Sequence, residues 1–262
     1  NMKYLYILFF SFSFFSCSEY QKILKNTDVS FKYDQAVNYF NNNDYARSLQ
    51  LFEGLLDDFV GNPKSEEVYY HYAYCFFYLQ DYISSAYHFD RFNKVFINSN
   101  KNEEMAFMHV YSFYKQSPRY SLDQLVTNEA IEKLELFIEN FPSSVRIPRV
   151  NELIFDLNKK IEKKYFEIVK SYYTTGKFKS AIFAINNFLA EFPETQYIDE
   201  ISFVQLNAYY SLAQNSIEEK MKQRVKEAIF ACDDYLMAFP NGDNVEQVKD
   251  IHEKLKKLEN GL

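Results

Sequence analysis

Hydrophobic residues recur every three or four positions along most of this chain, with charged and amide side chains between them. That spacing predicts amphipathic helices rather than strands. The pattern breaks at the prolines, which we place between helices because proline removes a hydrogen bond from a helix interior. The breaks lie at Pro63, Pro118, Pro142, Pro148, Pro193 and Pro240, and Gly61, Gly176 and Gly242 punctuate the chain in the same way.

The breaks divide the chain into helical pairs. The first helices of the pairs are predicted near 31–42, 65–80, 101–116, 149–174 and 197–214. The second helices are predicted near 45–60, 82–97, 122–140, 178–191 and 217–238. The charged, amphipathic tail 244–259 suits a capping helix, and Gly54, inside a regular helical stretch, is expected to mark a close helix crossing.

The second helices repeat one another in sequence. EAIEKLELFIENFP (129–142), SAIFAINNFLAEFP (180–193) and EAIFACDDYLMAFP (227–240) align without gaps, and 47–60 and 84–97 are looser copies. A period of roughly 34 residues with insertions is typical of helix–turn–helix solenoids. We therefore predict an all-α tetratricopeptide-repeat solenoid of about five units. Small residues are expected where its helices cross, at Ala36, Ala73, Ala130, Ala181 and Ala228, and large ones beside them, at Phe52, Phe89 and Phe188.

Composition supports a folded, helical, acidic protein. Phe and Tyr make up 27 + 23 = 50 of the 262 residues, with no Trp, so the chain can bury a large core. Gly and Pro are too few for a sandwich, a barrel or a disordered chain, which need turn residues. The formal net charge is −7, so nucleic-acid binding through phosphate neutralisation is not expected.

The beginning of the chain resembles an export signal. Residues 2–16 (MKYLYILFFSFSFFS) carry one basic residue and then a charge-free run, which predicts a signal peptide over 1–16; a buried first helix is the alternative. Phe14-Phe15-Ser16-Cys17 resembles a bacterial lipobox, with Phe14 where Leu is usual. This predicts a lipidated Cys17, a linker over 17–30 and a repeat domain over 31–262.

Catalytic and metal-binding motifs are missing from the sequence. It holds no G-x-S-x-G, H-E-x-x-H, Gly-rich phosphate loop or Cys-x-x-Cys, and its acidic pairs are typical of solvated helix faces. The histidines, at 71, 88, 109 and 252, are interpreted as helix side chains rather than metal ligands. We expect no enzyme activity and no cofactor besides the lipid. Cys75 and Cys232 are interpreted as two small buried side chains, with a disulfide as the alternative.

A ladder of aromatic residues marks the first helices of the first three repeats. A spacing of 37 residues carries Tyr33 to Tyr70 and Phe107, Val37 to Tyr74 and Tyr111, and Phe40 to Phe77 and Tyr114. On the concave surface of such a stack these rings would hold an extended peptide, with phenol groups meeting its backbone. The alternative is that they fill the core between repeats, and the sequence does not choose. The predicted groove comprises Tyr33, Phe40, Tyr70, Tyr74, Phe77, Phe107, Tyr111 and Tyr114.

Several segments together resemble one family. The lipobox-like Cys17 is followed by Lys32-Tyr33 with Ala36 and Tyr39-Phe40, then by Glu66-Glu67-Val68 and Tyr72-Ala73-Tyr74. The segment SPRYSLDQLVTNEAIEKLELFI (117–138) looks like the third-repeat insertion of Bacteroidetes-type members. These features are similar to the BamD family, the tetratricopeptide lipoproteins of the outer-membrane β-barrel assembly machine.

The resemblance implies a non-enzymatic scaffold anchored at the periplasmic face of the outer membrane. In that family the C-terminal repeats dock on the POTRA domains of the barrel protein BamA, and the N-terminal repeats meet the C-terminal signal of unfolded barrel precursors. No docking residue follows from it. The alternatives are another periplasmic tetratricopeptide lipoprotein, for cell-wall coordination or glycan uptake, and an enzyme that uses acid pairs on a helical scaffold.

Overall fold

Residues 19–261 of the computed structural model are described here, and within that range the chain forms helices and turns without strands. They fall into two compact units. Unit 1 contains residues 19–118 and 123–157, and unit 2 contains 119–122 and 158–261. The long helix α8 (Ile147–Thr174) gives its first part to unit 1 and the rest to unit 2.

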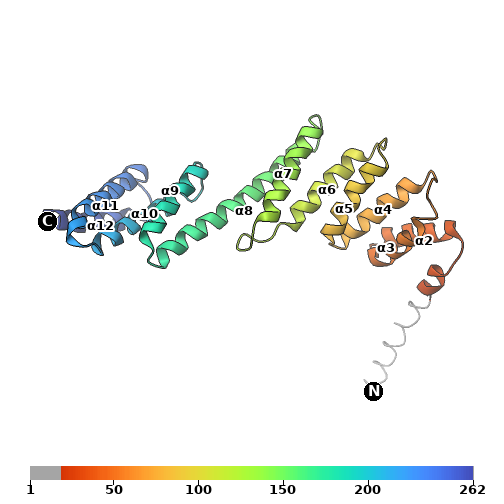
Figure 1. The fold of residues 1–262 in the computed structure, drawn as a ribbon, viewed down its shortest axis with the longest axis horizontal. Coiled ribbons are helices and arrows are strands. Elements are labelled where there is room, and N and C mark those ends of the chain that lie inside the picture. The colour runs from red at the N-terminus through yellow and green to blue at the C-terminus, as the bar shows by residue number, and fades with distance from the viewer. Residues whose placement is uncertain (1–18, 262) are drawn as a thin grey trace, which may run out of the picture. The chain divides into compact units, whose positions relative to one another are not determined.

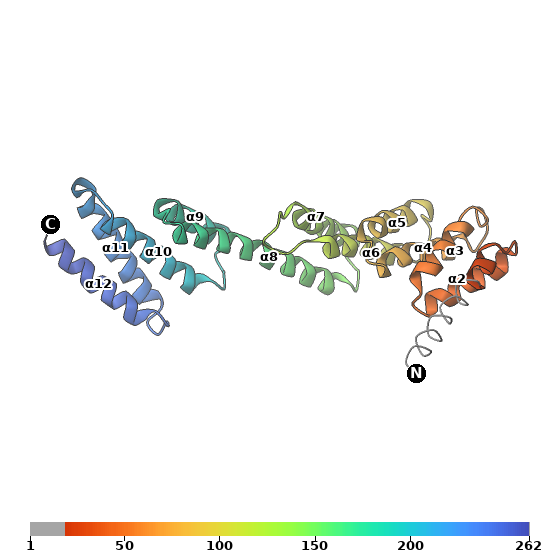
Figure 2. The same ribbon diagram turned by 90° about the horizontal axis from the view of Figure 1, so that it is seen from below.

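Antiparallel helical pairs build both units (Figures 1 and 2). Unit 1 contains α2 (Val29–Asn41), α3 (Tyr45–Leu55), α4 (Ser65–Tyr78), α5 (Tyr82–Val95), α6 (Asn102–Gln116) and α7 (Leu125–Asn140). Unit 2 contains α9 (Phe178–Glu191), α10 (Ile198–Gln214), α11 (Glu218–Ala238) and α12 (Val245–Asn260). The predicted helices and the all-α class are confirmed, with the one larger difference that α3 ends at Leu55 and 56–60 form turns.

Two expectations about helix breakers are wrong. Pro148 is the second residue of α8 rather than a residue between helices; the first turn tolerates proline because its N–H has no partner within the helix. Gly54 does not mark a close helix crossing, since a Cβ added there would meet nothing within 4 Å. It lies on the exposed side of α3, one residue before the helix ends.

The turns within helical pairs share one local design. Asn43, Gln80 and Gly176 each adopt a left-handed φ, of 61°, 64° and 72°, immediately before the next helix. In the first two turns the following residue is an aspartate that caps the helix: Asp44 accepts from the N–H of Arg47, and Asp81 from that of Ser84. Such caps satisfy backbone donors that the helix leaves unpaired.

The predicted crossing residues lie in the core. All five alanines are fully buried, as are Phe52 and Phe89, and Phe188 is nearly so. In unit 1, α7 packs on the first part of α8 through Leu134, Val150 and Leu153. In unit 2, the rest of α8 packs on α9 and α10 through Phe166, Ile185 and Ile201.

A polar contact recurs between successive repeats. A glutamate of a first helix accepts a hydrogen bond from a hydroxyl in the turn that precedes the next first helix. The pairs are Glu66–Ser99 (2.9 Å), Glu103–Ser144 (2.6 Å) and Glu162–Thr195 (2.5 Å). The first two belong to unit 1 and the third to unit 2, so the same contact holds repeats together in both units.

Residues 19–24 form a short helical segment that packs on the α2–α3 pair. They lie inside the predicted linker 17–30.

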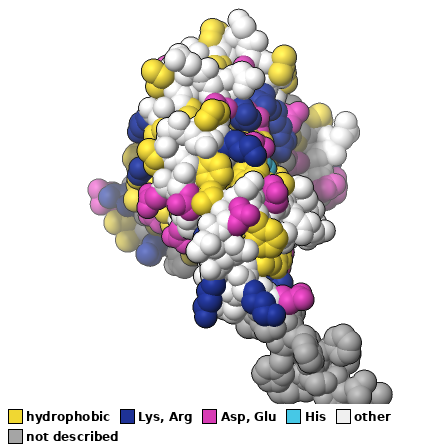
Figure 3. All heavy atoms as spheres, turned by 90° about the vertical axis from the view of Figure 1, so that its right-hand side faces the viewer, with side chains coloured by type: hydrophobic (Ala, Val, Ile, Leu, Met, Phe, Trp, Pro, Cys, Tyr) yellow, Lys and Arg dark blue, Asp and Glu magenta, His cyan; other side chains and the backbone are white. Residues whose placement is uncertain are grey.

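Exposed hydrophobic side chains lie among charged ones on the end of unit 1 that faces the viewer in Figure 3. Within residues 19–261, no helix is long and apolar enough to span a membrane.

Candidate peptide-binding site

The aromatic ladder of unit 1 forms one network of touching rings. From α2, Phe40 contacts Tyr78 of α4, with ring centroids 5.8 Å apart. Phe77, also on α4, lies 5.7 Å from Tyr111 of α6. Tyr111 then stacks on Phe107 at 5.6 Å and on Tyr114 at 5.7 Å. First helices of three successive repeats are therefore joined through aromatic side chains, as the 37-residue spacing predicts.

Two tyrosines of α4 share one carboxylate of α6. Tyr70 donates to Glu104 Oε1 at 2.9 Å, and Tyr74 donates to the same oxygen at 2.5 Å. The two rings lie 4.7 Å apart. Burial, strengthened by the bond to Glu104, raises the pKa of Tyr70 to about 12, and burial raises the pKa of Tyr74 further. Both phenols therefore remain protonated donors at any physiological pH.

Cations lie over the faces of this network. The Lys101 ammonium is 5.6 Å from the Tyr70 ring centroid, and the Lys115 ammonium is 5.8 Å from that of Tyr111. The Arg146 guanidinium lies 5.2 Å from the Phe107 ring. Such contacts favour a cation over an electron-rich ring. Two of these cations are also ion-paired, Lys101 with Glu66 at 3.0 Å and Arg146 with Glu103 at 3.8 Å.

The eight predicted groove residues do not have equal access to solvent. Tyr33 and Tyr74 are buried, and the other six are partly exposed. Tyr33 also lies apart from the network, because its ring packs on Phe52 and Phe59 of the first repeat. The core and groove interpretations thus apply to different residues of the predicted groove. Tyr33 and Tyr74 pack in the interior, and the other six keep a surface that a ligand could contact.

Sequence reasoning missed two residues of the network, Glu104 and Tyr78. Tyr78 is 44% exposed, stacks on Tyr45 at 4.5 Å and links Phe40 to Tyr74. Its position at the end of α4, directly after Phe77, could have indicated from the sequence that it belongs to the network. The role of Glu104 could not be predicted from the sequence. It belongs to the Glu103-Glu104 pair in the first turn of α6, and acidic pairs are common at helix starts.

Unit 2 has two pockets lined mainly by apolar side chains, whereas the pocket of about 510 Å³ between α5, α6 and α7 of unit 1 also has Asp90, His109 and Lys133 in its lining. One, of about 680 Å³, lies between α8 and α9 and includes Tyr165 and Phe183. The other, of about 770 Å³, lies between α9, α10 and α11 and includes Phe230. Phe183 and Phe230 occupy equivalent positions of two aligned repeats and are 69% and 66% exposed. Large apolar side chains at such exposure are typical of protein interaction sites.

The histidines and thiols are engaged in packing. His71 stacks on Phe52, His88 accepts or donates at 2.9 Å with the Tyr69 hydroxyl, and His109 Nδ1 lies 2.9 Å from the Ala86 carbonyl oxygen. Cys75 and Cys232 are free and fully buried, so their interpretation as small buried side chains is confirmed. Within residues 19–261, no group of three potential ligands is placed to hold a metal ion. Cys17 lies outside the described residues.

Comparison with known families gives one match that covers most of the chain. The family model YfiO, described as an outer membrane lipoprotein, matches residues 25–224. The match includes the whole aromatic network and the α8–α9 pocket. No curated protein matches the chain.

Three solved structures with some likeness to the chain are repeat proteins. A tetratricopeptide-repeat protein from Bacteroides fragilis shares 14% identity, with a TM-score of 0.38, over 89% of this chain and 100% of its own. A putative kinesin light chain from Podospora anserina with tetratricopeptide-like repeats shares 12%, with a TM-score of 0.33, over 86% and 95%. The C-terminal part of a repeat protein from Cytophaga hutchinsonii shares 13%, with a TM-score of 0.32, over 85% and 95%.

Proposed function

We propose, from the premise that the chain belongs to the YfiO family of outer membrane lipoproteins, that it is a non-enzymatic scaffold of the outer-membrane β-barrel assembly complex. The proposed anchor is a covalent lipid, palmitate among its acyl chains, on Cys17, with residues 1–16 removed as a signal peptide. The proposed location is the periplasmic face of the outer membrane. Several acyl chains on one cysteine suffice for stable anchoring.

The aromatic network of unit 1 is proposed to bind the C-terminal signal of unfolded barrel precursors. The carrying observation is the continuous run of partly exposed rings from Phe40 through Phe77 to Tyr111 and Tyr114. An extended peptide with aromatic side chains would stack on these rings, and Lys115, beside Tyr111, would meet its terminal carboxylate. Tyr74 supports the site from beneath rather than touching the peptide, because its phenol is buried and bonded to Glu104.

The two pockets of unit 2 are proposed to receive the POTRA domains of a BamA-type barrel protein. They lie in the C-terminal repeats, where the family resemblance implies this contact. Phe183 and Phe230 each stand at a pocket with most of their surface exposed, as expected of residues that become buried in a complex. The equivalent position is the charged Glu132 in the third repeat and the exposed Tyr87 in the second, so phenylalanine stands there in both repeats of unit 2 and in neither of these two repeats of unit 1.

Peptide binding tests the first contact. A fluorescent peptide that copies a precursor's C-terminal signal is titrated with the wild type, with Tyr78→Ala and with Tyr165→Ala. The two tyrosines are 44% and 50% exposed, in the network and in unit 2, so truncation costs little stability in either case. We expect Tyr78→Ala to weaken binding by roughly fivefold, since stacking on one ring contributes about 1 kcal/mol, and Tyr165→Ala to leave it unchanged. Equal affinities of all three proteins would contradict the site.

A charge placed in each pocket tests the second contact. Phe183→Asp and Phe230→Asp together should leave the helical circular dichroism unchanged, because both side chains are exposed in the free protein. They should strongly reduce binding of purified POTRA domains, since an unpaired carboxylate would be buried in the complex. The matched control is Tyr87→Asp, at the equivalent position of the second repeat and 56% exposed. Undiminished POTRA binding by the double variant would refute this surface.

A further inference from the structure

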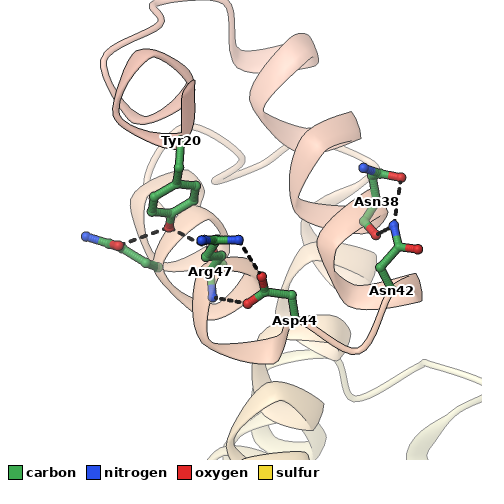
Figure 4. Close-up of polar contacts among 6 residues, drawn as sticks. Tyr20, Asn38, Asn42, Asp44 and Arg47 are labelled. Atoms are coloured by element: carbon green, nitrogen blue, oxygen red, sulfur yellow. Dashed lines mark hydrogen bonds and ion pairs between the residues drawn. The ribbon is translucent and has the colours of Figure 1, made fainter. Parts of the chain in front are cut away.

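The segment directly after the proposed lipidation site is fixed to the first repeat. The Tyr20 hydroxyl donates to the Arg47 carbonyl oxygen at 3.0 Å and to Gln50 Oε1 at 2.9 Å (Figure 4). Its ring packs edge-on against Tyr39, with centroids 5.5 Å apart. The Arg47 guanidinium lies 5.4 Å from the Tyr20 ring and is held by Asp44 at 2.9 Å. Tyr20 is buried, so the chain is held to α3 from this residue onward.

This attachment limits how far unit 1 can stand from a lipid on Cys17. Tyr20 lies three positions after Cys17, and an extended chain spans at most about 3.6 Å per residue, or roughly 11 Å in all. The headgroup region of one leaflet is about 5–8 Å thick, so it takes up much of this reach. The bound holds whatever conformation residues 17–19 adopt. The bound depends on the proposed lipidation of Cys17.

Tyr20 lies at one particular edge of unit 1, where the turns within the helical pairs gather. Tyr20 meets the end of α2 and the start of α3, and Tyr45 stacks on Tyr78 at the next turn. Gln116, at the end of α6, donates to the Tyr82 carbonyl oxygen at 3.1 Å. Figures 1 and 2 show the α4–α5 and α6–α7 turns on the same edge of unit 1 as residues 19–24. We call residues 41–45, 78–83, 115–118 and 123–126 the anchor edge.

Exposed aliphatic side chains line the anchor edge. Leu79, Ile83 and Leu125 are all exposed, and Ile83 has 74% of its surface in solvent. The aspartates of this edge, Asp44, Asp81 and Asp123, each accept a hydrogen bond from a backbone N–H. Its other charged residue is Lys115, whose ammonium lies 5.9 Å from the Tyr82 ring centroid. Apolar side chains at an interface gain from entering the boundary between headgroups and acyl chains.

We propose that the anchor edge of unit 1 lies on the lipid surface, with Leu79, Ile83 and Leu125 entering the bilayer interface. The opposite edge also exposes aliphatic side chains, at Val60, Ile97 and Val145. The short chain between Cys17 and Tyr20, the tether, places the anchor edge nearer to the lipid than the opposite edge. The helices between the two edges have 11 to 16 residues, so they hold the opposite edge about 16–24 Å further away. The first helices and their aromatic network would then stand upright on the membrane, within reach of precursors arriving there.

Single tryptophans test the proposal cleanly, because the natural chain has none. Ile83→Trp and Ile97→Trp are a matched pair, 74% and 71% exposed, on opposite edges of unit 1. Each full-length lipoprotein is purified and reconstituted in phosphatidylethanolamine–phosphatidylglycerol vesicles with brominated acyl chains. We expect Ile83→Trp to lose about half of its fluorescence or more, because its ring would lie at the boundary between headgroups and acyl chains, in contact with the brominated chains, and Ile97→Trp to keep its signal. Equal quenching, or stronger quenching of Ile97→Trp, would overturn the proposal.

Two further measurements separate this inference from the proposed function. A flexible Gly/Ser spacer of ten residues between Ser18 and Glu19 should bring the quenching of Ile83→Trp down to that of Ile97→Trp; persistent quenching would show that the tether does not set the orientation. Intact mass reports the lipid on Cys17. A protein without lipid would refute the anchor and, with it, this inference. A lipidated protein with equal quenching would refute the orientation alone.

Discussion

Units 1 and 2 use the same helical pair but fill it differently. In unit 1 the interior is dominated by rings that touch rings, such as Tyr33, Phe52, Phe89 and Phe92. In unit 2 the last repeat is filled mainly by small and aliphatic side chains, including Leu206, Ala228 and Val225. In unit 1 the buried rings continue into the partly exposed aromatic network, as Phe89 contacts Tyr74 and Phe77. In unit 2 rings also contact rings, as Phe166 stacks on Tyr197 at 4.1 Å, but the exposed Phe183 and Phe230 stand beside pockets.

One scaffold therefore presents two kinds of surface, which suit the two kinds of recognition proposed above. A continuous aromatic face accepts extended peptides in several registers, because every ring offers a similar surface. Isolated pockets favour a folded partner that presents matching side chains. The predictions below concern the difference in packing and charge between the units, beginning with the largest effect.

Removing one buried ring should damage unit 1 severely. Phe89 is fully buried, with its ring 5.1 Å from Tyr74 and 6.3 Å from Phe77. Phe89→Ala should lower the free energy of unfolding by about 3–5 kcal/mol, the usual cost of a cavity of this size. The matched substitution Phe183→Ala, in unit 2, should cost less than about 0.5 kcal/mol because its ring is exposed. Urea unfolding followed by circular dichroism measures both, and similar costs would contradict the comparison.

Mild acid should loosen unit 1 through His88. Burial lowers the pKa of His88 to about 4, with Arg91 acting in the same direction and Asp81 against it. The unfolded chain therefore binds the proton first, so stability is complete above pH 6.5 and falls as pH drops toward 4. The loss at pH 5 should be about 1–2 kcal/mol.

Burial also lowers the pKa values of His71 and His109, which adds to the effect in unit 1. Thermal unfolding at pH 7.5 and pH 5 measures the loss, and His88→Gln should make it smaller. A melting temperature independent of pH in this range would show that these histidines remain accessible to protons in the folded state.

A missing helix cap should be easy to restore in unit 2. Lys177 precedes α9 with nearly the backbone conformation of Asp81 before α5, yet it makes no side-chain cap bond. Lys177→Asp should stabilise the protein by about 0.5–1 kcal/mol, and Asp81→Ala should destabilise it by about 1 kcal/mol. Melting temperatures of the two variants should shift in opposite directions; a loss of stability in Lys177→Asp would show that the two turns are not equivalent.

Much of the fold could be predicted from sequence because helix boundaries depend on local chemistry. Proline, glycine and the Asp-Tyr turns set the limits of α4, α5 and α9 to within two residues. Pro148 was misplaced because the rule that proline ends helices has an exception in the first turn. Gly54 was misinterpreted because a glycine near a helix end does not indicate one particular structural feature.

The candidate site could be predicted only in part. The 37-residue spacing identified most aromatic residues of the network, because stacked repeats place equivalent residues side by side. It could not separate buried Tyr74 from partly exposed Tyr111, since both occupy equivalent positions and only the neighbouring α5 and α7 decide their burial. The glutamate–hydroxyl contacts between repeats, such as Glu162–Thr195, were invisible because their spacing varies with the insertions.

The most direct test of the account is to identify the proteins that remain bound to the tagged lipoprotein after mild detergent extraction of the outer membrane. Mass spectrometry should find a near-stoichiometric barrel protein with POTRA domains, and Phe183→Asp with Phe230→Asp should remove it. Its reproducible absence, with cell-wall or glycan-uptake proteins in its place, would contradict the assembly role and favour another periplasmic adaptor.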